Sequence, residues 1–180
     1  MEANKHTYAS AAITLLQKLI ATPSFSKEED ATATILFDYL VKNGVTPNRY
    51  LNNVWATNKH FDFLKPTILL NSHHDTVKPN AGYTIDPYDP IIKEGKLYGL
   101  GSNDAGASLV SLLHVFLHYF NAPNLTYNLI FAGTAEEEIS GKNGIESLVP
   151  HLPVIDAAII GEPTRMQLAV AERGLMVLDV

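Results

Sequence analysis

The sequence of 180 residues contains no cysteine. This absence excludes disulfide bonds, iron–sulfur clusters, thiolate zinc sites and cysteine nucleophiles, so His, Asp and Glu are the side chains left to bind a metal. Charged residues are also few, at 18%, while apolar residues make up 46%. That composition excludes a disordered or fibrous chain, and we expect a folded domain with its own core.

Runs of basic residues and long apolar runs are missing too. The 13 Lys and Arg stand against 19 Asp and Glu, which gives a net charge of −6. Nucleic acids and anionic membrane surfaces are therefore not expected as partners. No window reaches the roughly 18 apolar residues of a membrane span, and residues 1–20 lack the apolar core of a signal peptide. We expect a soluble, cytoplasmic protein with a small-molecule substrate.

Predicted helices and strands alternate along most of the chain. Hydrophobic spacing predicts helices at residues 8–21, 26–44, 109–120 and 145–149. Strands are predicted at residues 49–57, 67–71, 126–131 and 157–160, with a small hairpin at 91–98. The strand at 157–160 is apolar throughout, which is typical of a strand buried on both faces. This alternation predicts an α/β fold with a mostly parallel, twisted sheet and helices on both faces.

The start of the second predicted helix has a recognisable pattern. Ser26 and Glu29 are three residues apart, as in a capping box, where the two side chains satisfy free backbone N–H groups. The sequence therefore predicts that both side chains cap this helix.

Side chains that can bind a metal follow three apolar strands or lie in a glycine-rich loop. They are His73, Asp75, Asp104, Glu136, Glu137, Glu138 and Glu162. Because ligands bind beyond the carboxyl ends of the strands in open α/β sheets, we expect these side chains to converge. So many carboxylates would repel one another unless a cation lay among them, which predicts a metal site.

Each of these signals has a simpler explanation by itself. Asp104 could cap the helix that follows it, and residues 136–138 could be a solvated charged face. Glu162 could be a turn residue, and His73 a structural histidine. Their joint placement at strand ends favours the metal site.

His114 and His118 are four residues apart on the predicted helix at 109–120. They lack the glutamate of a zinc-binding H-E-x-x-H motif, and both lie opposite the apolar stripe of the helix. We interpret both as surface residues that do not bind metal.

Four motifs, in this order, resemble those of the M20 family of zinc-dependent amidohydrolases and peptidases. They are residues 72–77 (SHHDTV), 99–104 (GLGSND), 134–138 (TAEEE) and 161–164 (GEPT). Within the family the chain is most similar to the acetylornithine deacetylases and their succinyl-diaminopimelate desuccinylase relatives. The resemblance implies a metal-binding, zinc-peptidase-like catalytic domain over residues 1–173, with its C-terminal part missing from this chain. Residues 174–180 would begin an α+β lid and dimerisation domain.

The resemblance also implies the roles of the site residues. The implied ligands of two zinc ions, or of cobalt or manganese as substitutes, are His73, Asp104, Glu138 and Glu162. Asp104 would bridge the two ions and precede a cis peptide bond. Glu137 would be the general base, and Asp75 would hydrogen-bond the second nitrogen of His73. An alternative register, with Glu136 as base and Glu137 as ligand, stays open, although the alignment of the opening Thr134 favours the first.

The activity implied is hydrolysis of N-acetyl-L-ornithine to L-ornithine and acetate, in arginine biosynthesis, by a homodimer formed through the lid. An N-succinyl-ornithine or succinyl-diaminopimelate desuccinylase, or a dipeptidase, is an alternative on the same scaffold. A non-catalytic metal-binding fragment is a further alternative. The family's second zinc site needs a histidine from near the C-terminus of a longer chain, and no histidine follows Glu162 here.

Overall fold

The computed structural model describes residues 2–171, with residues 2–7 described by their backbone alone. The helices are α1 (Glu2–Ile20), α2 (Asp30–Lys42), α3 (Ser108–Tyr119) and α4 (Ile145–Leu148). The main sheet holds β1 (Asn48–Tyr50), β2 (Asn53–Thr57), β3 (Thr67–His73), β6 (Asn128–Thr134) and β7 (Ala157–Ile160). A separate hairpin contains β4 (Ile91–Lys93) and β5 (Lys96–Tyr98). None of the described helices is long and apolar enough to cross a membrane.

The five strands of the main sheet lie in the order β1-β2-β6-β3-β7. β3 runs parallel to both β6 and β7, while β2 is antiparallel to β6 and to β1. The segment 49–57, predicted as one strand, is a hairpin because Leu51 adopts a left-handed conformation, with φ 53°, and turns the chain. The sheet is therefore mixed, and the predicted α/β fold is confirmed.

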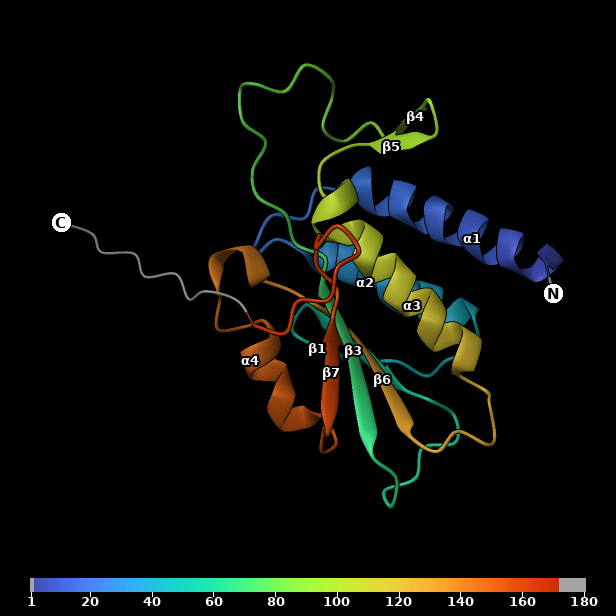
Figure 1. The fold of residues 1–180 in the computed structure, drawn as a ribbon. Helices are drawn as coiled ribbons and strands as arrows, with labels where there is room; N and C mark the ends of the chain where they lie inside the picture. Colours follow the sequence, from blue (N-terminus) through green and yellow to red (C-terminus); the bar gives the residue numbers. More distant parts are fainter. Residues whose placement is uncertain (1, 172–180) are drawn as a thin grey trace.

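Helices cover both faces of the sheet (Figure 1). Because successive side chains of a strand point to opposite faces, Leu70 of β3 packs in the core beneath α1, α2 and α3. Its neighbour Leu69 packs on the other face with Leu148 of α4. Because helices cover both faces of the parallel strands, the end of the sheet at which these strands terminate remains accessible to a ligand. The predicted lid strand at residues 174–180 lies outside the described residues.

β7 differs from its prediction. It was predicted to be buried on both faces, yet Ile159 and Ile160 are each 54% exposed. The reason is its place at the edge of the sheet: within residues 2–171, β7 pairs with β3 and with no second strand. An apolar composition indicates a strand that can be buried, but it does not say whether a neighbour covers it.

His114 also differs from its prediction. It is only 8% exposed, whereas His118, in the same helix, is exposed as predicted. The Nδ1 of His114 lies 2.7 Å from the carbonyl oxygen of Val110, which can only accept, so Nδ1 carries the proton. Its Nε2 then accepts from the hydroxyl of Tyr39, at 2.9 Å. Tyr39 belongs to helix α2 and covers the side of α3 that was predicted to face solvent.

Candidate metal centre

The candidate site lies at the carboxyl ends of the three parallel strands. His73 ends β3, and Asp75 follows it by two residues. Glu137 and Glu138 lie in a 3₁₀ turn, Glu137–Ile139, that follows β6. Two further carboxylates are Asp104, in the turn Ser102–Ala107 that leads into α3, and Glu162, just after β7. The parallel register of β3 with β6 and β7 places these ends side by side, which is why distant sequence positions meet.

His73 is the centre of this cluster. Its Nε2 lies 3.2 Å from Oδ1 of Asp104, 3.7 Å from Oε2 of Glu137 and 3.8 Å from Oε2 of Glu162. Among the described residues, two groups could each hold an ion with ligand atoms within 4.8 Å of one another: His73 with Asp104 and Glu138, and His73 with Glu137 and Glu162. The structure thus brings all four predicted ligands together with the predicted base. Glu137 is as close to His73 as Glu162 is, so its role as base stays a prediction.

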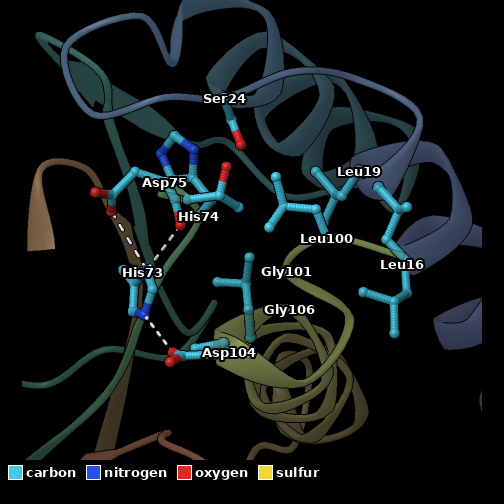
Figure 2. A pocket seen from close by; sticks show the side chains of 14 residues that line it. Leu16, Leu19, Ser24, His73, His74, Asp75, Leu100, Gly101, Asp104 and Gly106 are labelled. Carbon is cyan, nitrogen blue, oxygen red and sulfur yellow. Dashed lines mark hydrogen bonds and ion pairs between the residues drawn. The ribbon is translucent and has the colours of Figure 1, made fainter. Parts of the chain in front are cut away.

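The second nitrogen of His73 faces Asp75. Nδ1 lies 3.0 Å from the backbone oxygen of Asp75 and 3.3 Å from its Oδ1. Figure 2 shows the imidazole between Asp75 on one side and Asp104 on the other. Since both partners of Nδ1 accept hydrogen bonds, Nδ1 keeps its proton and Nε2 is the nitrogen left to bind a cation.

Asp75 also holds the turn that carries the two glutamates. Its buried carboxylate accepts hydrogen bonds from the backbone nitrogens of Glu137, at 3.0 Å, and Glu138, at 3.2 Å. The hydroxyl of Ser26 donates to the same carboxylate at 2.7 Å. Burial alone would raise the pKa of Asp75, but the hydrogen bonds from His73, Ser26 and the Glu137 backbone, together with the charge of His73, stabilise the charged form and lower it. Asp75 is therefore a structural anchor of the site as well as the partner of His73.

The electrostatics of His73 depend on its acidic surroundings. Burial disfavours its charged form, but the hydrogen bond and charge of Asp75 outweigh this effect. The charges of Glu162 and Glu137 act in the same direction, and the pKa of His73 is raised to about 9. Without a metal, the imidazole therefore carries the positive charge that balances part of the cluster.

The carboxylates are perturbed in the direction that crowding predicts. Burial raises the pKa of Glu162 to about 7; the charge of His73 opposes the rise, and the charges of Glu137, Asp104 and Glu138 add to it. Burial and the charge of Asp104 also raise the pKa of Glu138. A divalent cation would relieve this repulsion, and imidazole nitrogen with carboxylate oxygen is a donor set that suits zinc. The residues present therefore fit a metal centre.

The site is open on one side and enclosed on the other. The side chains of Asp104 and Glu137 are 57% and 54% exposed, so solvent or a substrate can reach them. Behind the imidazole lies a cavity of about 20 Å³, room for one water, with Leu19 and Leu100 in its apolar wall (Figure 2). An apolar wall lowers the local dielectric and strengthens the interactions of His73.

Glu136 does not share the site with its two neighbours. Its backbone is left-handed, with φ 54°, and its carboxylate is buried among donors of Asn143, the backbone nitrogen at 3.3 Å and Nδ2 at 2.8 Å. Neither candidate ligand group includes it. The structure therefore places Glu137 and Glu138, the preferred register, at the cluster.

Sequence reasoning missed the role of Ser26 and Glu29. Helix α2 begins at Asp30, and Glu29 is the N-cap residue, but its side chain makes no capping hydrogen bond. The predicted capping box is wrong because both side chains have other partners: Ser26 donates to Asp75, and Glu29 accepts from the backbone nitrogens of Lys27 and Glu136. The S-x-x-E pattern therefore identified two residues that make structural hydrogen bonds, but these bonds do not cap the helix.

Comparison with known proteins identifies a family model that matches the chain and solved structures with a similar fold. Residues 69–173, more than half of the chain, match the model of peptidase family M20/M25/M40. The fold is similar to a metallo-carboxypeptidase of the M20 family, Sso-CP2 from Sulfolobus solfataricus, with TM-score 0.70, 23% identity, and 83% of this chain and 37% of that one covered.

Two other solved structures share the fold. Human carnosine dipeptidase 1 matches with TM-score 0.68, 20% identity, and 87% of this chain and 39% of that one covered. The Bacillus subtilis YXEP protein, described as a dinuclear metal-binding peptidase, matches with TM-score 0.64, 16% identity, and 86% and 43% covered. This chain therefore spans 37–43% of the length of these three structures. The match over residues 69–173, which includes His73, Asp104 and Glu137, shows that the chain belongs to peptidase family M20/M25/M40.

Proposed function

We propose that this chain forms a dinuclear zinc centre that hydrolyses an amide bond of an N-acylated amino acid. The observation that carries the proposal is the imidazole of buried His73, with three carboxylates within 3.8 Å of its Nε2. His73 and Glu162 would hold one ion, Asp104 would be shared, and Glu138 would bind the other. Zinc bound there would supply a Lewis acid for the scissile carbonyl and for the attacking water.

The chain's own residues supply the rest of the chemistry. Glu137 is about half exposed and points into the cluster, where it can accept a proton from the attacking water and deliver it to the leaving amine. Asp75 keeps the Nδ1 proton of His73 in place and holds the Glu137 backbone at a fixed distance. Because Asp75 binds both His73 and the turn that carries Glu137, the proposed base is held in a fixed orientation before the substrate binds.

For the substrate we propose N-acetyl-L-ornithine, with a cytoplasmic homodimer in arginine biosynthesis as the setting. The similarity of the four motifs to acetylornithine deacetylases supports this choice, and the net charge of −6 supports a small molecule over nucleic acid or a membrane. Succinylated amino acids and dipeptides are the alternatives. The dipeptide is supported by the printed names of the similar structures, a carboxypeptidase and a dipeptidase.

A second candidate is a metal-binding chain without catalytic activity. Both ligand groups among the described residues rely on the same imidazole, that of His73. Two ions cannot each take this nitrogen, so one of the two sites would be held by carboxylates alone and would bind more weakly.

Release of free amine decides between these candidates. The zinc-loaded chain is incubated with N-acetyl-ornithine, N-succinyl-ornithine and a dipeptide, beside a Glu137→Gln variant whose zinc content is measured. We expect amine release from one acylated substrate, lowered by at least about 100-fold in the variant. Zinc binding without release from any substrate would support the non-catalytic candidate. Loss of zinc from Glu137→Gln would contradict the role of base.

A further inference from the structure

We propose that Glu29 is a positioning residue for the turn that carries Glu137. The proposal rests on the proposed function, since Glu137 is a general base only in that case. Glu29 immediately precedes α2 and is 0% exposed. It belongs to neither candidate ligand group, so its buried carboxylate calls for another explanation.

The carboxylate of Glu29 joins three separate segments of the chain. Its Oε1 accepts hydrogen bonds from the backbone nitrogens of Lys27, at 2.6 Å, and Glu136, at 3.2 Å. Its Oε2 accepts from Nδ2 of Asn52, at 2.9 Å. The loop before α2, the turn between β1 and β2, and the turn after β6 are therefore fixed to one side chain. An ionised carboxylate suits this place because it only accepts hydrogen bonds and all three neighbours donate.

The turn after β6 needs such support. Glu136 and Ser140 have φ values of 54° and 48°, so left-handed, non-glycine residues flank the turn Glu137–Ile139. Residues other than glycine adopt this conformation at a cost and keep it when the surroundings hold them there. Glu29 holds the N–H of Glu136, while Asp75 holds the N–H of Glu137. The direction in which the Glu137 side chain leaves the turn is thus set by two buried carboxylates.

The same side chain reaches the other wall of the site through Asn52. The backbone oxygen of Asn52 accepts from Nε2 of His74, at 2.9 Å, and His74 directly follows the proposed ligand His73. Nδ1 of His74 in turn faces the hydroxyl of Thr32, at 2.9 Å. Loss of Glu29 would therefore free the turn of the base first, with a smaller effect on the histidine side of the site.

Kinetics of position-29 variants in the zinc-loaded chain test this role. We expect Glu29→Ala to lower kcat by about 100-fold, the loss typical of a catalytic group displaced by about 1 Å, with little change in KM or zinc content. Glu29→Gln keeps an oxygen for Lys27 and Glu136 and should restore most of kcat. Asp30→Ala is the matched control, because Asp30 is the next residue, is 84% exposed and pairs with Arg49 on the surface.

Amide hydrogen exchange gives a readout that does not need activity. We expect residues 133–142 to exchange faster in Glu29→Ala than in the wild type, Glu29→Gln or Asp30→Ala. If the wild type releases no amine from any substrate, the proposed function fails, while this exchange pattern still supports the hold of Glu29 on the turn. If Glu29→Ala does not fold, Glu29→Asp replaces it, since its shorter side chain cannot reach Asn52 and Glu136 together.

Two results would overturn the proposal. One is a folded Glu29→Ala or Glu29→Asp variant with wild-type exchange over residues 133–142. The other is an active wild type whose kcat is unchanged in these variants, or falls equally in Asp30→Ala.

Discussion

Oδ1 of Asp75 lies 3.0 Å from the backbone nitrogen of Glu137 and 3.3 Å from Nδ1 of His73. A single buried carboxylate therefore orients the proposed ligand and the proposed base at once. Because His73 and Glu137 share this partner, a displacement of Asp75 would change the positions of both. A site of this kind depends on the residues behind it as much as on the atoms that face the substrate.

Asp75→Asn should weaken zinc binding by about 10- to 100-fold, the usual effect of removing a partner behind a metal ligand. The amide of the variant would place an NH₂ group where the wild-type carboxylate oxygen accepts a hydrogen bond, so that two donors would face each other. Competition with a chelator measures this affinity. Ser26→Ala is the control, because it removes only the 2.7 Å hydrogen bond from the Ser26 hydroxyl and should have a smaller effect. Wild-type affinity in Asp75→Asn would show that the anchor is dispensable.

The stability of the metal-free protein should fall between pH 7 and 9. The pKa of His73 is raised from 6.5 to about 9 because the hydrogen bond and charge of Asp75 outweigh the effect of burial. The folded state therefore holds this proton more tightly than the unfolded state. Its contribution to stability is complete below pH 6.5 and is lost as the pH rises through 9. Urea-unfolding midpoints in EDTA measure the decline.

The two buried histidines His74 and His114 do not confound this range. The pKa values of His74 and His114 are lowered by burial, so their contributions change only below their ordinary value of 6.5. His73→Ala should remove most of the decline between pH 7 and 9. Zinc added at pH 8 should raise the midpoint of the wild type, because binding to the folded state alone stabilises it. A wild-type midpoint that stays level or rises over this range would be incompatible with the raised pKa.

Tyr39→Phe should lower the free energy of unfolding by about 1 kcal/mol, since Nε2 of His114 loses its donor. Zinc affinity should not change, because neither residue belongs to a ligand group. Tyr119→Phe is the control: its side chain is more exposed, at 39%, and the substitution should cost less than about 0.5 kcal/mol. Urea unfolding measures both variants, and equal losses would argue against the buried hydrogen bond.

The metal cluster could be predicted from the sequence because the carboxyl ends of parallel strands lie side by side, so residues that directly follow such strands come close together. His73, Glu137 and Glu162 follow strands whose carboxyl ends must meet at one edge of the sheet. The separation of Glu136 from Glu137 could not be predicted, because it depends on a left-handed residue and on Asn143, which lies seven residues further along.

Three features needed the tertiary structure. Ser26 and Glu29 form a pattern that serves a helix cap or a tertiary contact equally well, and only their neighbours decide between the two. The burial of His114 depends on Tyr39 from another helix, which the spacing within α3 does not reveal. The exposure of β7 depends on which strands lie beside it, which its own composition does not encode.

Zinc binding by the wild-type chain and by Asp104→Asn is the most direct test of the metal centre. Asp104 is the carboxylate nearest to Nε2 of His73, at 3.2 Å, and in the proposed centre it is shared by both ions. Titration with zinc should show binding to the wild type and an affinity at least about 10-fold lower in the variant. Absence of zinc binding in the wild type, or equal affinity in the two proteins, would contradict the metal centre proposed here.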